Sequence, residues 1–267
     1  MNTVVIKNEQ PKGWKQIGFV ATALLFVLFD FFFLEGATEA LEPWLPSDCG
    51  GCNGESFVPD SYRWFAVSHG ALLALMFGGS LIALLRRPFE KPMLLHFYAV
   101  GHLLFLASFA ATAPKLAIGK AFVFVMFALI LSILFAFYHK RAAAIKLAAP
   151  TGYSSPLLVL TTIAAIFLIP IAIHAGIQQW SETGEYFGWG EHTAMLFVLL
   201  YGSFLTASQR AGSYALGIIV SLTFMYLGVS ALAVPDHPGS WGIVGGITSI
   251  LFGVVYVSVM IYSNRMR

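Results

Sequence analysis

Eight apolar stretches, each about as long as a membrane-spanning helix, divide this chain of 267 residues. A helix needs roughly 20 apolar residues to cross the hydrocarbon core of a bilayer. Hydrophobic residues make up 58% of the chain and charged residues only 10%, so a soluble domain of this size would lack polar surface. We therefore expect an all-α polytopic membrane protein with eight transmembrane helices. The predicted helices cover residues 17–34, 62–85, 92–112, 116–138, 156–176, 187–208, 212–234 and 241–262.

Basic residues gather in alternate loops between these stretches. If the N-terminus is cytoplasmic, only Arg63, Lys115 and Lys120 of the 15 Lys and Arg residues fall on the outer side. Cytoplasmic loops of membrane proteins carry such an excess of positive charge. We therefore expect a multi-pass protein of the cell inner (cytoplasmic) membrane with both termini in the cytoplasm. The basic residues flank the helices, so the lipid bilayer is the expected partner and nucleic acid is not.

A segment that begins at His69 is repeated 123 residues later by a segment that begins at His192. The two copies match at several further positions: Ala71/Ala194, Leu73/Leu196, Gly79/Gly202, Ser80/Ser203 and Arg87/Arg210. An even number of predicted helices separates the copies, so both have the same orientation. This pattern predicts one membrane domain built from two parallel four-helix repeats, residues 1–145 and 146–267. A pseudo-two-fold axis along the membrane normal would relate them.

Each copy of the repeat places an imidazole inside the bilayer, and a polar residue at that depth usually marks a functional site. His69 lies about seven residues into its helix, which is roughly 10 Å below the outer surface. If the two halves pack around the axis, His69 and His192 could face a shared central space. Opposed imidazoles suit haem b, and a transition metal ion also fits. Packing hydrogen bonds and a proton relay remain alternatives for both residues.

Further titratable residues lie in the predicted outer half of the bilayer. Asp30, Glu35, His174 and Glu191 join the two repeated histidines there as candidate metal ligands. Carboxylates and imidazoles suit transition metals, and they suit a proton path equally well. For Glu35 and Glu191, solvation at the membrane surface is the simpler interpretation. His102, near the middle of the third predicted helix, is a weaker second site.

Two cysteines, Cys49 and Cys52, lie in the long loop between the first two predicted helices. The predicted topology places this loop of the first repeat outside the cytoplasm, where disulfides persist. We expect a disulfide that staples the loop, while a redox-active or metal-binding pair remains an alternative.

These features predict an integral membrane redox or metal protein with a histidine-rich site in the outer half of the bilayer. Such a protein would transfer electrons or oxidise a lipid-soluble substrate, possible partners being a quinone or other membrane subunits, and would then be a membrane oxidoreductase. A proton- or cation-coupled transporter or channel is the main alternative, because charged groups within a bundle can carry protons. An accessory subunit of a larger membrane complex is a third.

Overall fold

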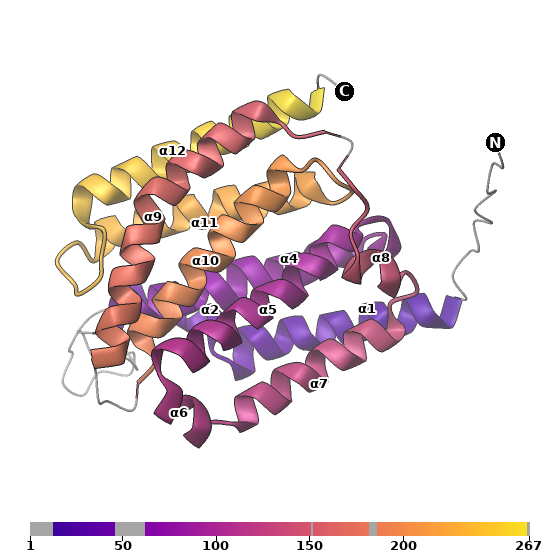
Figure 1. The fold of residues 1–267 in the computed structure, drawn as a ribbon, viewed down its shortest axis with the longest axis horizontal. Coiled ribbons are helices and arrows are strands. Elements are labelled where there is room, and N and C mark those ends of the chain that lie inside the picture. Colours follow the sequence, from indigo (N-terminus) through magenta and orange to yellow (C-terminus); the bar gives the residue numbers. More distant parts are fainter. Residues whose placement is uncertain (1–12, 46–61, 151, 182–185, 266–267) are drawn as a thin grey trace.

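The computed structural model describes residues 13–45, 62–150, 152–181 and 186–265. Over these ranges the chain is helical and contains no strand. The long helices run side by side along one direction, and the start of α1 lies at the same end as the finish of α12 (Figure 1). Cys49 and Cys52 fall outside the described ranges, so their predicted disulfide stays a prediction.

The first half of the chain contains both regular and widened helical turns. Its elements are α1 (Gly13–Leu28), the π-helix η1 (Phe29–Phe33), α2 (Gly36–Glu39), η2 (Glu42–Trp44), α3 (Arg63–Gly70), the π-helix η4 (Ala71–Gly78), α4 (Gly79–Leu85), η5 (Pro88–Glu90), α5 (Pro92–Thr112), α6 (Pro114–Gly119), α7 (Phe122–Phe137) and α8 (Arg141–Ile145). The second half is simpler, with α9 (Ser155–Ser181), α10 (Gly188–Ala207), α11 (Ser213–Ala233) and α12 (Gly242–Arg265). Pro170 lies within α9 without ending it.

In the described part of the chain, six helices are long and apolar enough to cross a membrane, which confirms the prediction of a helical, multi-pass membrane protein. They are Gly13–Phe33, Arg63–Leu85, Pro92–Thr112, Ser155–Ser181, Ser213–Ala233 and Gly242–Arg265. The predicted helix 116–138 is instead divided into α6 and α7, which leaves an apolar helix of 16 residues. Eight crossings therefore remain a prediction.

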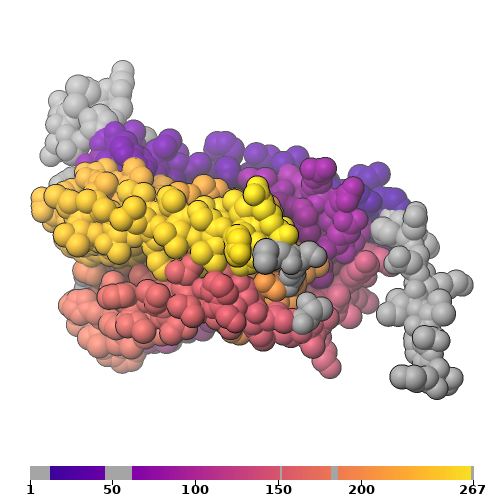
Figure 2. Space-filling view, turned by 90° about the horizontal axis from the view of Figure 1, so that it is seen from above, coloured from indigo at the N-terminus to yellow at the C-terminus, as the bar shows by residue number. Residues whose placement is uncertain are grey.

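Helix α10 lies at the centre of the bundle and packs against α9, α5, α11 and α3. Thirteen of its 20 residues are buried, so protein rather than lipid surrounds its polar groups. Polar residues within membrane bundles face inward in this way. By contrast, α9 and α12 form one outer face of the molecule (Figure 2), where Phe167 and Leu251 are largely exposed. These apolar faces are suited to lipid.

Small residues permit matched contacts across the centre of the bundle. Gly79 of α4 lies against Ile219 of α11, and Gly202 of α10 lies against Phe97 of α5. The two glycines are 123 positions apart, as the predicted repeat requires. The halves differ elsewhere, because α12 packs closely along α11, whereas α7 meets α5 mainly through aromatic side chains such as Phe127.

Candidate functional site

The two repeated histidines lie on neighbouring helices at one end of the bundle, which we call the histidine end. His69 of α3 has its Nδ1 atom 2.7 Å from Oε1 of Glu191. His192 of α10 has its Nδ1 atom 2.8 Å from Oγ of Ser68. Each imidazole thus bonds to the residue that precedes the other histidine. This exchange of partners is what a two-fold axis between α3 and α10 would produce.

His69 is held by acceptors at both ring nitrogens. Its Nε2 atom lies 2.6 Å from the carbonyl oxygen of Leu34, and Glu191 accepts from Nδ1. Since a neutral imidazole donates from only one nitrogen, both bonds together require the doubly protonated, cationic ring when Glu191 is ionised. A second carboxylate, Oε2 of Glu39, lies 3.9 Å from Nδ1. His69 is therefore the cation of a small acidic cluster.

This cluster is partly exposed at the histidine end. The side chains of His69, Glu191 and Glu39 keep 20%, 14% and 23% of their surface exposed. Burial raises the pKa of the Glu39 carboxyl from 4.5 to about 7, and the Glu191 carboxylate raises it as well, whereas the His69 cation lowers it. The Glu39 carboxyl therefore changes its protonation state near neutral pH.

Asp30 lies beneath this cluster, inside the bundle. Its side chain is fully buried, and neither carboxylate oxygen has a hydrogen-bond partner among the described residues. The carboxyl is close enough to His69 for the two charges to interact. An unpaired buried carboxylate strongly destabilises a folded protein. A carboxyl side chain in this position is therefore unexpected on grounds of stability alone.

Two π-helical segments hold Asp30 beside His69. Asp30 belongs to η1, whereas η4 follows directly after His69, and the two segments pack on one another. At Gly36 a β-carbon would come within 2.7 Å of the Asp30 carbonyl oxygen, so only glycine permits this approach. π-Helical turns are rare and occur frequently at functional sites.

Further buried polar groups continue from Asp30 toward the middle of the bundle. The Tyr98 hydroxyl lies within electrostatic range of Asp30 and has no hydrogen-bond partner in the described ranges. His102 packs against Tyr98, with ring centroids 4.2 Å apart, and stacks on Phe77 at 3.9 Å. Its Nδ1 atom bonds to the Tyr98 carbonyl oxygen, whereas Nε2 has no partner among the residues described.

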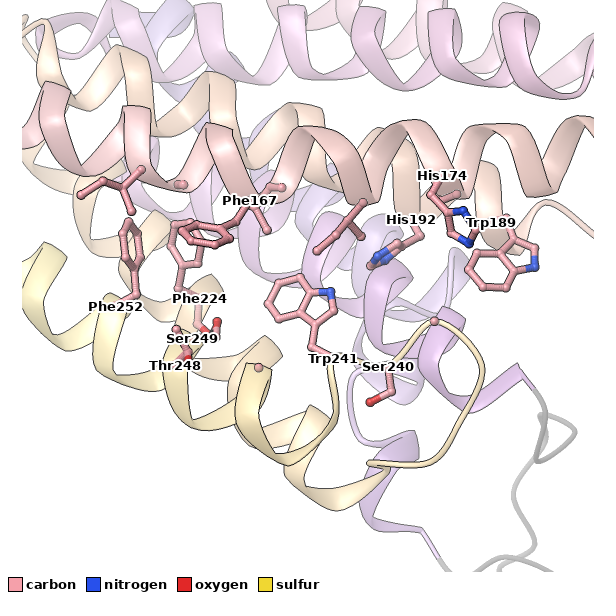
Figure 3. Close-up of a pocket in the computed structure, with 17 residues that line it drawn as sticks. Phe167, His174, Trp189, His192, Phe224, Ser240, Trp241, Thr248, Ser249 and Phe252 are labelled. Atoms are coloured by element: carbon pink, nitrogen blue, oxygen red, sulfur yellow. Dashed lines mark hydrogen bonds between the residues drawn. The ribbon is translucent and has the colours of Figure 1, made fainter.

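His192 occupies a different environment from His69. The indole rings of Trp64 and Trp241 flank it, with centroids 5.9 and 6.4 Å from the imidazole centroid. Its Nε2 atom is buried and has no hydrogen-bond partner in the part of the chain that is described. The residue lines a cavity of about 580 Å³ between α9 and α12, together with His174 and Trp241 (Figure 3).

The structure brings only part of the predicted metal-ligand set together. His69, Glu191 and Asp30 lie close to one another. His174 instead lies against Trp189, with centroids 6.4 Å apart, and Glu35 is exposed. Within the described ranges, no group of three or more His, Cys, Asp or Glu side chains could hold a metal ion.

A haem between the two histidines does not fit these contacts as they stand. Direct hydrogen bonds join α3 to α10 on both sides, through His69 and Glu191 and through His192 and Ser68. A flat macrocycle between the rings would have to break both bonds. A single ligand bond from Nε2 of His192 would break neither.

Three residues of the site escaped the sequence analysis: Ser68, Glu39 and Tyr98. Ser68 was detectable, because the 123-residue shift aligns it with Glu191, the neighbour of the second histidine. Glu39 and Tyr98 gave no such signal, since Glu39 follows an interruption in the helix and tyrosine is common in membrane helices.

No family model, curated protein or solved structure matches the chain. The geometry of the site is therefore the basis for inferring its function.

Proposed function

We propose that this chain is a proton-translocating membrane protein, acting as a transporter or channel, in which Asp30 is the proton-binding group. The proposal rests on the environment of Asp30, which is fully buried and whose two carboxylate oxygens have no hydrogen-bond partner among the described residues. A carboxylate in that environment is strongly unfavourable, whereas a protonated carboxyl is tolerated. Charged groups inside membrane bundles commonly mark proton paths.

The acidic cluster provides the connection to water. Glu39 and Glu191 are partly exposed, and both lie beside His69, whose charge reaches Asp30. Within the described ranges no hydrogen bond joins His69 to Asp30, so the last step of a proton path from water to Asp30 requires a water molecule between the two side chains. The orientation predicted from the basic loops places this entry on the outer face.

The buried groups on α5 extend the path inward. The Tyr98 hydroxyl and the Nε2 atom of His102 follow Asp30, and neither bonds to a described residue. Water molecules that bridge Asp30, Tyr98 and His102 would complete the hydrogen bonds of all three, and buried polar groups are commonly satisfied by water. The adjoining π-helical turns η1 and η4 offer a segment in which a small change of backbone could open or close this path.

Proton flux into liposomes tests the proposal. The protein would be reconstituted into liposomes that enclose the pH-sensitive dye pyranine. A potassium diffusion potential would then drive protons inward. We expect acidification above that of protein-free liposomes, reduced to background by Asp30→Asn and strongly slowed by His69→Phe. Glu35→Gln is the matched control, because Glu35 is an exposed carboxylate near the same helix end. Flux that is absent from the native protein, or unchanged in Asp30→Asn, would refute the proposal.

The predicted redox or metal protein has one observation in its favour, the Nε2 atom of His192 without a partner among the described residues. That nitrogen could ligate haem b or a transition metal ion. His69 would supply a second ligand only if its own hydrogen bonds broke. An absorption spectrum and elemental analysis of the purified protein test this second candidate. A haem band or bound metal that disappears in His192→Ala would establish it.

A further inference from the structure

The cavity beside His192 is separate from the acidic cluster around Asp30. Figure 3 shows it bounded by α9 on one side and by α12 with its preceding loop on the other. Its volume of about 580 Å³ lies within the range of small-molecule sites, roughly 300–1,000 Å³. The body of the cavity is apolar, lined by residues such as Ile163, Phe167, Phe224 and Phe252.

The cavity is open on the apolar face formed by α9 and α12, which is suited to lipid. Phe167 and Ile163 of α9 line it and are 68% and 40% exposed, and both belong to a helix able to span the membrane. Thr248, on the facing wall of α12, is exposed as well. The cavity is lined along α12 from Gly245 to Phe252, which at 1.5 Å per residue is about 10 Å. This shape suits a hydrocarbon chain entering from the bilayer.

Two of the polar atoms toward one end of the cavity are buried and lack a partner among the described residues. They are the indole Nε1 atom of Trp241 and the imidazole Nε2 atom of His192. Figure 3 shows the indole nitrogen on the side of Trp241 that faces His192. Buried polar atoms without partners are rare in proteins, and each calls for an explanation.

The hydrogen bonds behind His192 fix what its free nitrogen can do. The Ser68 hydroxyl lies 3.2 Å from the Trp64 carbonyl oxygen and 2.8 Å from Nδ1 of His192. Both contacts are hydrogen bonds only if the hydroxyl donates to Trp64 and accepts from Nδ1. A neutral imidazole protonated at Nδ1 carries a lone pair at Nε2. His192 therefore accepts a hydrogen bond at the cavity, whereas Trp241 can only donate one.

We propose that this cavity binds a long-chain amphiphile whose head group is a hydroxyl, such as a lipid alcohol or a quinol. A hydroxyl accepts from Trp241 and donates to His192, so it satisfies both buried atoms at once. An ester or ether oxygen only accepts, which leaves Nε2 of His192 without a donor. A carboxylate also only accepts, and its charge would face the imidazole lone pair. The hydrocarbon tail then lies against the apolar walls and projects toward the bilayer.

Photolabelling in nanodiscs of phosphatidylcholine tests this site. The probe is dodecanol with a diazirine near the end of its chain, and labelled peptides are mapped by mass spectrometry. We expect saturable labelling of α9 and α12, displaced by excess dodecanol and much less by dodecyl methyl ether or laurate. This competition series requires no substitution, so it does not depend on a variant that folds. Labelling that does not saturate, or that the ether displaces as well as the alcohol, overturns the proposal.

Two substitutions test the individual hydrogen bonds. Trp241→Phe and His192→Phe keep an aromatic ring and remove the polar atom. Each should weaken probe binding by roughly threefold to tenfold, which corresponds to the loss of one net hydrogen bond. Trp180→Phe, on an exposed face of α9 away from the cavity, is the matched control and should bind as the native protein does. Unchanged binding in both cavity variants, or an equal loss in the control, would refute the assignment.

Discussion

Glu39 provides a test of the acidic cluster that does not depend on the proposed function. Burial raises its pKa from 4.5 to about 7 in the folded protein. The folded chain therefore binds this proton more tightly than the unfolded chain does. The contribution of Glu39 is most favourable below pH 4.5, declines as the pH rises, and is lost above about pH 7. A difference of this size corresponds to at most about 3 kcal/mol of unfolding free energy.

Glu39→Gln removes the charge that causes this decline. We expect the variant to gain stability relative to the native protein between pH 5 and pH 8, by up to about 3 kcal/mol at pH 8. Because other groups titrate over the same range, the informative quantity is the difference between the two proteins at each pH.

Unfolding in mixed detergent micelles, followed by circular dichroism at four pH values, measures this difference. Asp236→Asn is the control, since Asp236 is an exposed carboxylate outside the acidic cluster. It should follow the pH profile of the native protein. If the difference between Glu39→Gln and the native protein stays flat from pH 5 to pH 8, or grows toward low pH, burial does not govern this carboxyl and the description of the cluster is wrong.

Three further predictions concern packing, and thermal unfolding in detergent measures each. Gly228→Ala should destabilise the protein by about 1–3 kcal/mol, because the new β-carbon would lie 2.6 Å from a carbonyl oxygen of α12; Gly119→Ala, which meets nothing within 4 Å, is its control and should be neutral. Ser68→Ala should cost about 1–3 kcal/mol by leaving Nδ1 of His192 without its partner, and an unchanged midpoint would contradict that hydrogen bond. His102→Phe should destabilise the protein by about 1–3 kcal/mol, because it removes the Nδ1 hydrogen bond to the Tyr98 carbonyl oxygen and places a larger ring in a fully buried site. A raised or unchanged midpoint in this variant would contradict that account.

The apolar stretches predicted the helices well because a membrane helix must be apolar over its whole length. They predicted one boundary poorly. The stretch 116–138 reads as a single helix, yet the chain breaks at Lys120, between α6 and α7. Hydropathy averages over such a break, and a single lysine near a helix end is compatible with an unbroken span. The sequence did not predict the two π-helical segments either, since a widened turn depends on packing between η1 and η4 rather than on composition.

The sequence located the site more reliably than it predicted the contacts within it. The shared position of His69 and His192 implied that both would lie at one depth, and they do lie on adjoining helices. This shared position did not predict that each imidazole would form a hydrogen bond with a residue of the other helix. A shared space between the two rings can be predicted only if the direction of each side chain is known. Sequence periodicity gives this direction only within a single helix.

The difference between the two histidines follows from the residues that precede them. The exchanged pairing presents His69 with the residue before His192, which is Glu191, and presents His192 with the residue before His69, which is Ser68. A carboxylate holds a cationic imidazole, whereas a hydroxyl that donates elsewhere leaves its imidazole neutral. One predicted repeat thus yields a charged centre beside Asp30 and a neutral acceptor beside the apolar cavity. Exchanging these two residues, as Ser68→Glu with Glu191→Ser, should therefore move the cation from His69 to His192, and ¹⁵N chemical shifts of the two rings would detect that transfer.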